Sequence, residues 1–209
     1  MNGKQESKEQ ILNKKERLAL IRELETELAF GRFIHTMEVA STAANLAMCY
    51  GEDPAKAELA GLLHDCAKCM SLNKMLKICE KAGVPLSDIE KTSGSLLHSK
   101  AGAVLAADKY GVEDEDILNA IRYHTTGRPG MSLLEKIVFV ADYIEPGRDS
   151  APNLPLVRGL AYDNIDDCVL QILKDTLGYL GTTGQRTDPM TQKTYDYYRR
   201  CDEERKFYE

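Results

Sequence analysis

Helix signals run along almost the whole chain, and no segment alternates apolar and polar residues as a half-buried strand does. Apolar residues recur at spacings of three and four, and most of these runs end at a glycine or a proline. With 209 residues, of which 43% are apolar, the chain can bury a core of its own. The sequence therefore predicts an all-α protein, an irregular bundle of roughly seven to ten helices.

Capping residues delimit several of the predicted helices. Asp53 is a good N-cap before a proline in the first helical position, and Ser132 precedes a strongly apolar run. The predicted helices occupy residues 5–29, 33–50, 55–68, 72–83, 95–111, 113–124, 133–146, 160–181 and 194–209. Residues 148–157 and 182–190 are rich in turn-forming residues and are predicted to be loops.

Charge and cysteine content exclude several classes of protein. The 27 basic and 33 acidic residues give a net charge of −6, which argues against a surface that binds nucleic acid. No apolar run is long enough to span a membrane, and the charged N-terminus lacks the apolar region of a signal peptide. Cys66 and Cys69 form an isolated C-x-x-C pair, which we interpret as small core or boundary residues. A reducing cytoplasm is the expected location.

The stretch "LLHDCAK", residues 62–68, places three polar groups in an otherwise apolar segment. His64 shares its predicted helix face with small residues of the preceding two turns, which leave room for a ligand or for a close helix approach. Asp65 follows about 100° further round the helix, so its carboxylate and the imidazole can converge on one point. Lys68 lies one turn beyond His64.

The remaining histidines and one further aspartate complete a pattern. His35, His98 and His124 each lie on a predicted helix of their own, and no other histidine occurs outside "LLHDCAK". Asp142 lies within the apolar segment "VFVADYI", where a lone carboxylate is costly unless it has a partner such as a metal ion. One helical histidine is more often a hydrogen-bonded boundary residue than a ligand. The joint pattern, however, indicates a metal site.

The order of these residues resembles that of the HD superfamily of metal-dependent phosphohydrolases. More narrowly, it is similar to the bacterial HD-type symmetrical bis(5′-nucleosyl)-tetraphosphatases. The resemblance rests on "RFIHTMEVA", "AGLLHDCAK", "LLHSKAGA" and "AIRYHTTGRPGMSLLEKIVFVADYIEPGR", which together cover most of residues 30–180. The last of these is the most specific, because HD proteins in general share only the metal ligands.

The resemblance also implies a domain organisation. Residues 1–30 are expected to form an N-terminal helix that packs on the core, and residues 31–180 the HD phosphohydrolase domain. Residues 181–209 are expected to add a C-terminal loop and helix to that same domain.

The resemblance implies four ligands of a divalent metal ion, namely His35, His64, Asp65 and Asp142. His98 and His124 either bind a second ion, with Asp65 bridging the two, or bind phosphate directly. The family favours iron, whereas these residue types alone suit Fe, Mn, Co and Zn about equally.

Further residues resemble the family's catalytic and substrate contacts. With Asp65, Lys68 is the expected catalytic residue, because its ammonium can stabilise charge on the transferring group. Arg32 and Arg148 resemble phosphate contacts, for which the planar guanidinium is suited. Thr125 can offer its hydroxyl to a phosphate or a ribose.

The function implied is hydrolysis of diadenosine tetraphosphate into two ADP by a metal-activated water. A hydrolase of deoxynucleotides or guanosine tetraphosphate, or a non-catalytic nucleotide-binding regulator, would carry the same ligand pattern. A cyclic-dinucleotide phosphodiesterase is less consistent with the sequence, because no G-Y-P follows the histidines. The expected partner is a small nucleotide rather than nucleic acid or a membrane. A homodimer is a hypothesis that the sequence does not decide.

Overall fold

The computed structural model describes residues 12–184 and 186–208, and within these ranges the regular secondary structure is entirely helical. The all-α prediction is therefore confirmed. The helices are α1 (Lys14–Glu27), α2 (Phe30–Tyr50), α3 (Pro54–Leu63), α4 (Leu72–Lys81), α5 (Gly94–Asp108), α6 (Glu115–Tyr123), α7 (Leu133–Ile144), α8 (Leu154–Asp163), α9 (Ile165–Thr183) and α10 (Pro189–Tyr208). A short 3₁₀ turn, η1 (Glu90–Thr92), precedes α5.

Helices α2 and α3 pack closely against each other. A Cβ atom on Gly61 of α3 would lie 2.7 Å from the Cα atom of Ala40 on α2, a distance that only glycine permits. The small-residue face of α3 thus serves a close helix approach. Helix α7 packs against both of these helices and against α6. Fully buried side chains such as Leu46, Leu63 and Val138 fill the space between them.

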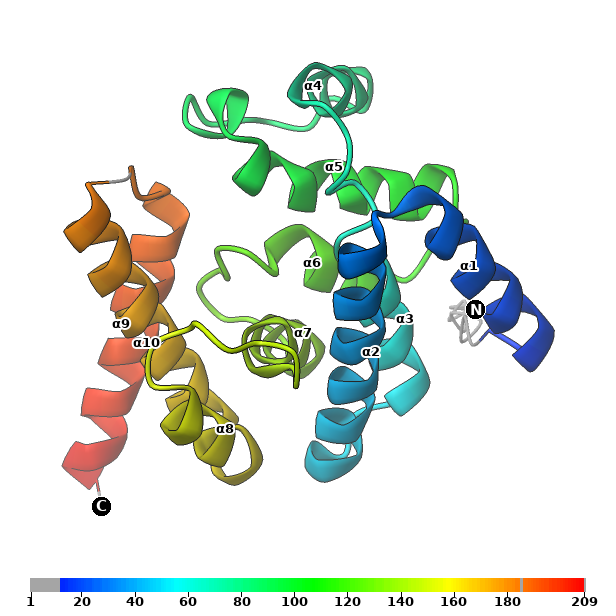
Figure 1. Cartoon of the computed structure of the whole chain (residues 1–209). Coiled ribbons are helices and arrows are strands. Elements are labelled where there is room, and N and C mark those ends of the chain that lie inside the picture. Colours follow the sequence, from blue (N-terminus) through cyan, green and yellow to red (C-terminus); the bar gives the residue numbers. More distant parts are fainter. Residues whose placement is uncertain (1–11, 185, 209) are drawn as a thin grey trace, which may run out of the picture.

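The remaining helices surround this centre on three sides (Figure 1). Helix α5 packs on α6, and α4 packs on the outer face of α5 through a small separate core that includes Met75, Cys79 and Leu97. Helices α8, α9 and α10 lie at one edge of the bundle, where α9 contacts α7 and α10 contacts α9. Helix α1 lies at the other edge of the bundle and contacts α2.

Three predicted boundaries in the C-terminal half are wrong. The last helix, predicted to begin at residue 194, already begins at Pro189. The loop predicted at residues 148–157 is shorter, because α8 already begins at Leu154. The helix predicted at residues 160–181 is two helices that meet at Asn164. The side chain of Asn164 accepts hydrogen bonds from the backbone amides of the two aspartates that follow, so it caps α9 and ends the preceding run.

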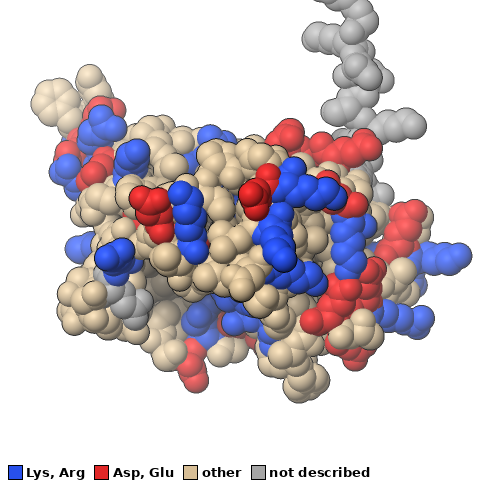
Figure 2. Space-filling model, turned by 90° about the horizontal axis from the view of Figure 1, so that it is seen from above, with Lys and Arg blue, Asp and Glu red and all other residues tan. Residues whose placement is uncertain are grey.

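The surface seen from above in Figure 2 carries basic and acidic side chains intermixed rather than separated into one basic face. Among the described residues, no helix combines the length and the apolar character that crossing a membrane requires.

Candidate metal centre

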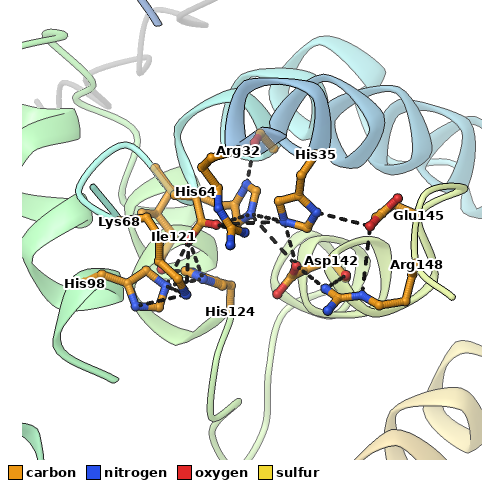
Figure 3. Close-up of polar contacts among 12 residues, drawn as sticks. Arg32, His35, His64, Lys68, His98, Ile121, His124, Asp142, Glu145 and Arg148 are labelled. Carbon is orange, nitrogen blue, oxygen red and sulfur yellow. Dashed lines mark hydrogen bonds and ion pairs between the residues drawn. The ribbon is translucent and has the colours of Figure 1, made fainter. Parts of the chain in front are cut away.

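Four imidazoles and two carboxylates converge where α2, α3, α5, α6 and α7 meet (Figure 3). They are His35 in α2, His64 and Asp65 just after α3, His98 near the start of α5, His124 just after α6 and Asp142 in the last turn of α7. The structure therefore brings together all six residues that the sequence pattern singled out. Most are buried, although each carries a polar group.

Several of these residues lie at helix ends rather than inside helices, contrary to the sequence-based expectation. Helix α3 ends at Leu63, and the chain continues in tight turns in which the amide of Lys68 donates to the carbonyl of Asp65. His124 likewise follows the last residue of α6. A helix end frees the side chain from the neighbouring turns. Consecutive residues such as His64 and Asp65 can therefore face the same point.

The first set of ligand atoms comprises Nε2 of His35 and His64, Oδ2 of Asp65 and Oδ1 of Asp142. Nε2 of His35 lies 3.1 Å from Oδ1 of Asp142 and 3.3 Å from Nε2 of His64. Oδ2 of Asp65 lies 3.5 Å from Nε2 of His64 and 3.8 Å from Nε2 of His35. Ligand atoms about 2.1 Å from one cation lie about 3–3.5 Å from one another. The atoms of His35, His64 and Asp142 thus lie close enough together to hold one ion, and Oδ2 of Asp65 lies beside the two imidazole nitrogens.

The second set faces the other oxygen of Asp65. Oδ1 of Asp65 lies 3.0 Å from Nε2 of His98 and 3.7 Å from Nε2 of His124. The two Nε2 atoms of His98 and His124 are 3.0 Å apart. The Asp65 carboxylate therefore stands between two groups of nitrogen atoms, as a bridging ligand would.

All four imidazoles present the same nitrogen to the centre. Nδ1 of His35 lies 3.2 Å from Oε1 of Glu145. The other three Nδ1 atoms face backbone carbonyls nearby in the chain: His64 at 2.7 Å from Gly61, His98 at 3.3 Å from Gly94 and His124 at 2.8 Å from Ile121. An acceptor at Nδ1 favours the tautomer with the proton there. The lone pair on Nε2 is then available to a metal.

The charges of the centre favour ionised carboxylates, and they shift the pKa values of the imidazoles in opposite directions. Burial lowers the pKa of His64, but Asp65 and Asp142 outweigh it and raise that pKa overall. Burial opposes ionisation of Asp65, but His64, His98 and Lys68 outweigh it and hold the pKa of that carboxyl well below its usual range. Burial, together with the neighbouring His98 and His64, lowers the pKa of His124 to about 3. His124 is thus a neutral imidazole at physiological pH.

This arrangement fits a bound cation. Oδ1 of Asp65 is buried and has no hydrogen-bond partner, although two imidazole nitrogens lie close to it. When Nε2 of His98 and of His124 both carry lone pairs, three electron-rich atoms face one another at 3.0–3.7 Å. A divalent ion among them converts this repulsion into three favourable contacts.

Three cationic side chains border the two carboxylates. Arg32 donates to Oδ2 of Asp65 at 2.7 Å, and Arg148 donates to Oδ1 of Asp142 at 3.1 Å. The ammonium of Lys68 lies 3.7 Å from Oδ1 of Asp65 and 3.1 Å from Nε2 of His98. Their side chains remain 29–35% exposed, so each can also reach a ligand in solution.

Thr125 lies beside the centre rather than in it. Its hydroxyl donates to Ser99 at 3.3 Å, and the residue lines a cavity of about 420 Å³. Leu96, Leu180 and Arg186 line the same cavity, which extends from α5 towards the C-terminal part of α9.

Sequence reasoning missed two carboxylates behind His35. Glu145, the residue after α7, is buried and contacts the ring of His35. Burial and the adjacent Glu145 raise the pKa of Glu38, which lies one turn along α2 from His35. The sequence signal was weak, because Glu145 precedes Pro146 and reads as part of a helix end.

Comparison with known proteins finds a family and relatives that match most of the chain. Residues 32–147 match the family model of the HD domain. A symmetrical bis(5′-nucleosyl)-tetraphosphatase of Bacillus subtilis is 41% identical over 186 residues, which cover 89% of this chain and 97% of that protein. A protein of the same description from Halalkalibacterium halodurans is 43% identical over 165 residues, 79% of this chain and 87% of its own. The crystal structure of a predicted HD superfamily hydrolase involved in NAD metabolism, from Clostridium acetobutylicum, superimposes with a TM-score of 0.84. It is 39% identical and covers 87% of this chain and 96% of its own.

Proposed function

Because the chain belongs to the HD domain family, we propose that it is a symmetrical bis(5′-nucleosyl)-tetraphosphatase that hydrolyses diadenosine tetraphosphate to two ADP. The observation that carries this proposal is the buried cluster of four imidazoles and two carboxylates, joined to about 40% identity with such enzymes over most of the chain. In the reaction, water adds to one of the two inner phosphorus atoms. The central P–O–P bond breaks, and one ADP leaves with the bridging oxygen.

We propose that the centre holds two divalent cations. His35, His64, Asp65 and Asp142 would bind the first, and His98 and His124 the second, with Asp65 bridging. The support is that the two oxygens of Asp65 face different groups of ligand atoms. Bound at these residues, the ions supply Lewis acidity, which lowers the pKa of a coordinated water and neutralises phosphate charge.

The basic side chains around the centre would neutralise the negative charge of the tetraphosphate. Lys68 lies at the end near His98, and Arg148 lies at the opposite end, beside Asp142 (Figure 3). A substrate cut at its middle carries phosphates on both sides of the scissile bond, and a cation at each end suits it. Lys68 would stabilise charge on the transferred group, whereas Arg148 and Arg32 would orient the flanking phosphates.

The cavity beside Thr125 offers a place for one nucleoside. It starts one residue from His124, and its volume of about 420 Å³ lies within the usual range of roughly 300–1,000 Å³ for small-molecule sites. Leu96 and Leu180 provide apolar walls for a base, and the Thr125 hydroxyl is placed for a ribose or an adjoining phosphate. Replacing Leu180 by Asp should therefore raise KM more than it lowers kcat.

We propose iron as the resident metal, on the strength of the family resemblance. Imidazole and carboxylate ligands accept iron, and they accept Mn, Co and Zn as well. Elemental analysis of protein purified without added metal tests this, and zinc or manganese as the main metal would contradict it.

A homodimer is the assembly we propose. Phe30, Ile34 and Met48 lie along one face of α2, and all three are exposed. An apolar row of this kind is a common dimer contact. Light scattering with a Met48→Lys variant tests it, since the charge should dissociate the dimer, and a monomeric wild-type protein would refute it.

The test of the function is product analysis by ion exchange after incubation of diadenosine tetraphosphate with the metal-replete protein. ADP as the single product is expected. AMP with ATP would keep the metal site but contradict symmetric cleavage. Absence of products, with metal bound, would contradict the substrate, and guanosine 3′,5′-bispyrophosphate would be the next compound to assay.

A further inference from the structure

His35 differs from the other three histidines in what lies behind its ring. The other Nδ1 atoms face backbone carbonyls within four residues along the chain, which no side-chain substitution removes. His35 instead depends on a carboxylate of a different element, Glu145, 110 residues away in the sequence. Its orientation is therefore set by tertiary contact rather than by local backbone geometry.

Glu145 is held firmly in its place. Its side chain is 5% exposed. Its backbone amide donates to the carbonyl of Ala141 at 3.1 Å, and its own carbonyl accepts from the guanidinium of Arg158 at 2.8 Å. The same guanidinium also binds the carbonyls of Ile144 and Arg148, so it fixes the whole turn after α7. Because Glu145 is itself fixed, it can fix the orientation of the His35 ring.

The packing around this carboxylate leaves no spare room. A Cβ atom on Gly147 would lie 3.0 Å from Oε2 of Glu145 and 2.5 Å from Oε2 of Glu38. Glycine at this position thus allows both carboxyl groups to lie against the backbone. Oε2 of Glu145 is directed into this packed region, and Oε1 is left to face Nδ1 of His35.

We propose that Glu145 is a positioning residue that holds the Nδ1–H tautomer and the orientation of the His35 ring, and thereby sets the affinity of the centre for its metal. A carboxylate that accepts from a ligating histidine makes that imidazole a better ligand, and loss of such a partner typically lowers metal affinity about 10–100-fold. This inference rests on the proposed role of His35 as a ligand. It does not depend on which nucleotide the protein cleaves.

The test is titration of the metal-free full-length protein with Co²⁺, followed by absorption spectroscopy. Glu145→Ala should lower Co²⁺ affinity about 10–100-fold and change the visible spectrum. Glu145→Gln keeps an oxygen that accepts from Nδ1–H but loses the charge, so its affinity should fall between those of wild type and Glu145→Ala. If Glu145→Ala does not fold, Glu145→Gln alone decides. Wild-type Co²⁺ affinity in the folded variants would overturn the proposal.

Two matched variants separate positioning from general stability. Glu135 is an equally buried glutamate on α7 that pairs with Arg128 away from the centre. Glu135→Gln should therefore lower Tm and leave Co²⁺ affinity unchanged. Glu38→Gln gives Oε2 of Glu145 a donor and keeps the Glu145 charge, so affinity should stay within about threefold of wild type. Equal losses of affinity in Glu135→Gln and Glu145→Gln would indicate a structural role only and contradict the proposal.

A nitrogen-detected NMR spectrum of the metal-free protein reads the tautomer directly, because a metal bound at Nε2 would itself fix the proton on Nδ1. Wild-type His35 should show protonated Nδ1, and Glu145→Ala should lose this single state. A wild-type protein that binds Co²⁺ normally but leaves diadenosine tetraphosphate intact would refute the proposed function. The Co²⁺ affinities of the Glu145 variants could still be compared with that of the wild type, so the positioning role would remain testable.

Discussion

The two sides of the Asp65 carboxylate face imidazoles whose orientation is fixed in different ways. On the Oδ1 side, Nδ1 of His98 and Nδ1 of His124 each face a backbone carbonyl of the residue's own helix. On the Oδ2 side, His64 likewise faces the carbonyl of Gly61, but His35 depends on the distant carboxylate of Glu145. The first construction follows from local helix geometry, whereas the second exists only after α2 and α7 have packed. An imidazole can thus be oriented by a nearby backbone carbonyl, which substitutions do not remove. It can also be oriented by a side chain of another element, which a single substitution removes.

Asp65→Ala should have the largest effect, because it removes the one residue common to both sides. We expect metal binding to fall to background and turnover to fall at least about 10³-fold, since the charge stabilisation and the activated water go together. Elemental analysis and product assays measure the two effects. Turnover within tenfold of wild type would show that neither side depends on Asp65.

Removal of the metal by a chelator should abolish activity and leave the fold intact. The buried apolar clusters contain none of the ligands, so helicity measured by circular dichroism should be retained. Tm should fall, because a ligand of the native state alone stabilises it. Activity should return with added metal, and unfolding on chelation would contradict the separation of core and centre.

Substitution of one histidine on each side tests whether the two sides hold separate ions. His35→Ala and His124→Ala should each reduce the metal content by about one equivalent per chain. They should also lower turnover by about 10²-fold or more. Full metal content in His124→Ala would assign His98 and His124 to phosphate instead. It would reduce the centre to a single ion.

Lys68→Ala should weaken the stabilisation of substrate charge without changing metal binding. The ammonium lies near both Asp65 and His98, but it is no ligand, so metal content should stay at the wild-type level. Turnover should fall about 10²–10³-fold, the usual cost of losing one preorganised charge-stabilising donor. Lys77→Ala, an exposed lysine of α4, is the matched control and should behave as wild type.

The smallest effect is expected from a substitution in the packing contact between α2 and α3. Gly61→Ala should cost about 1–3 kcal/mol of stability, because the new Cβ meets the backbone of Ala40 at 2.7 Å. Gly31→Ala, where a Cβ meets nothing within 4 Å, is the control and should be neutral or slightly stabilising. Scanning calorimetry compares the two, and equal Tm values would contradict the close α2–α3 contact.

Much of this molecule follows from local sequence signals. The caps at Asp53 and Ser132 set the starts of α3 and α7 as predicted, and their side chains accept backbone hydrogen bonds. The missed break at Asn164 carried a signal of the same kind, an asparagine followed by two aspartates. The apolar periodicity that continues across it outweighed this signal.

Other features depend on packing that no local pattern records. The helix predicted to run through Lys68 stops at Leu63, because the chain changes there to hydrogen bonds that span three residues. The spacing of apolar residues hardly differs between an α-helix and turns of this kind, so the sequence pattern does not mark the change. The partnership of Glu145 with His35 spans 110 residues, and its prediction would require the relative position of α2 and α7.

The positions of the ligands along the chain also determine what a bound ion would cross-link. A cation held by His35 and Asp142 would close a loop of about half the chain, in which α3 to α6 are all enclosed. Helices α8, α9 and α10 follow Asp142 and supply no ligand, so they lie outside that loop. Metal loading should therefore slow amide exchange in α2 to α7 by far more than in α10.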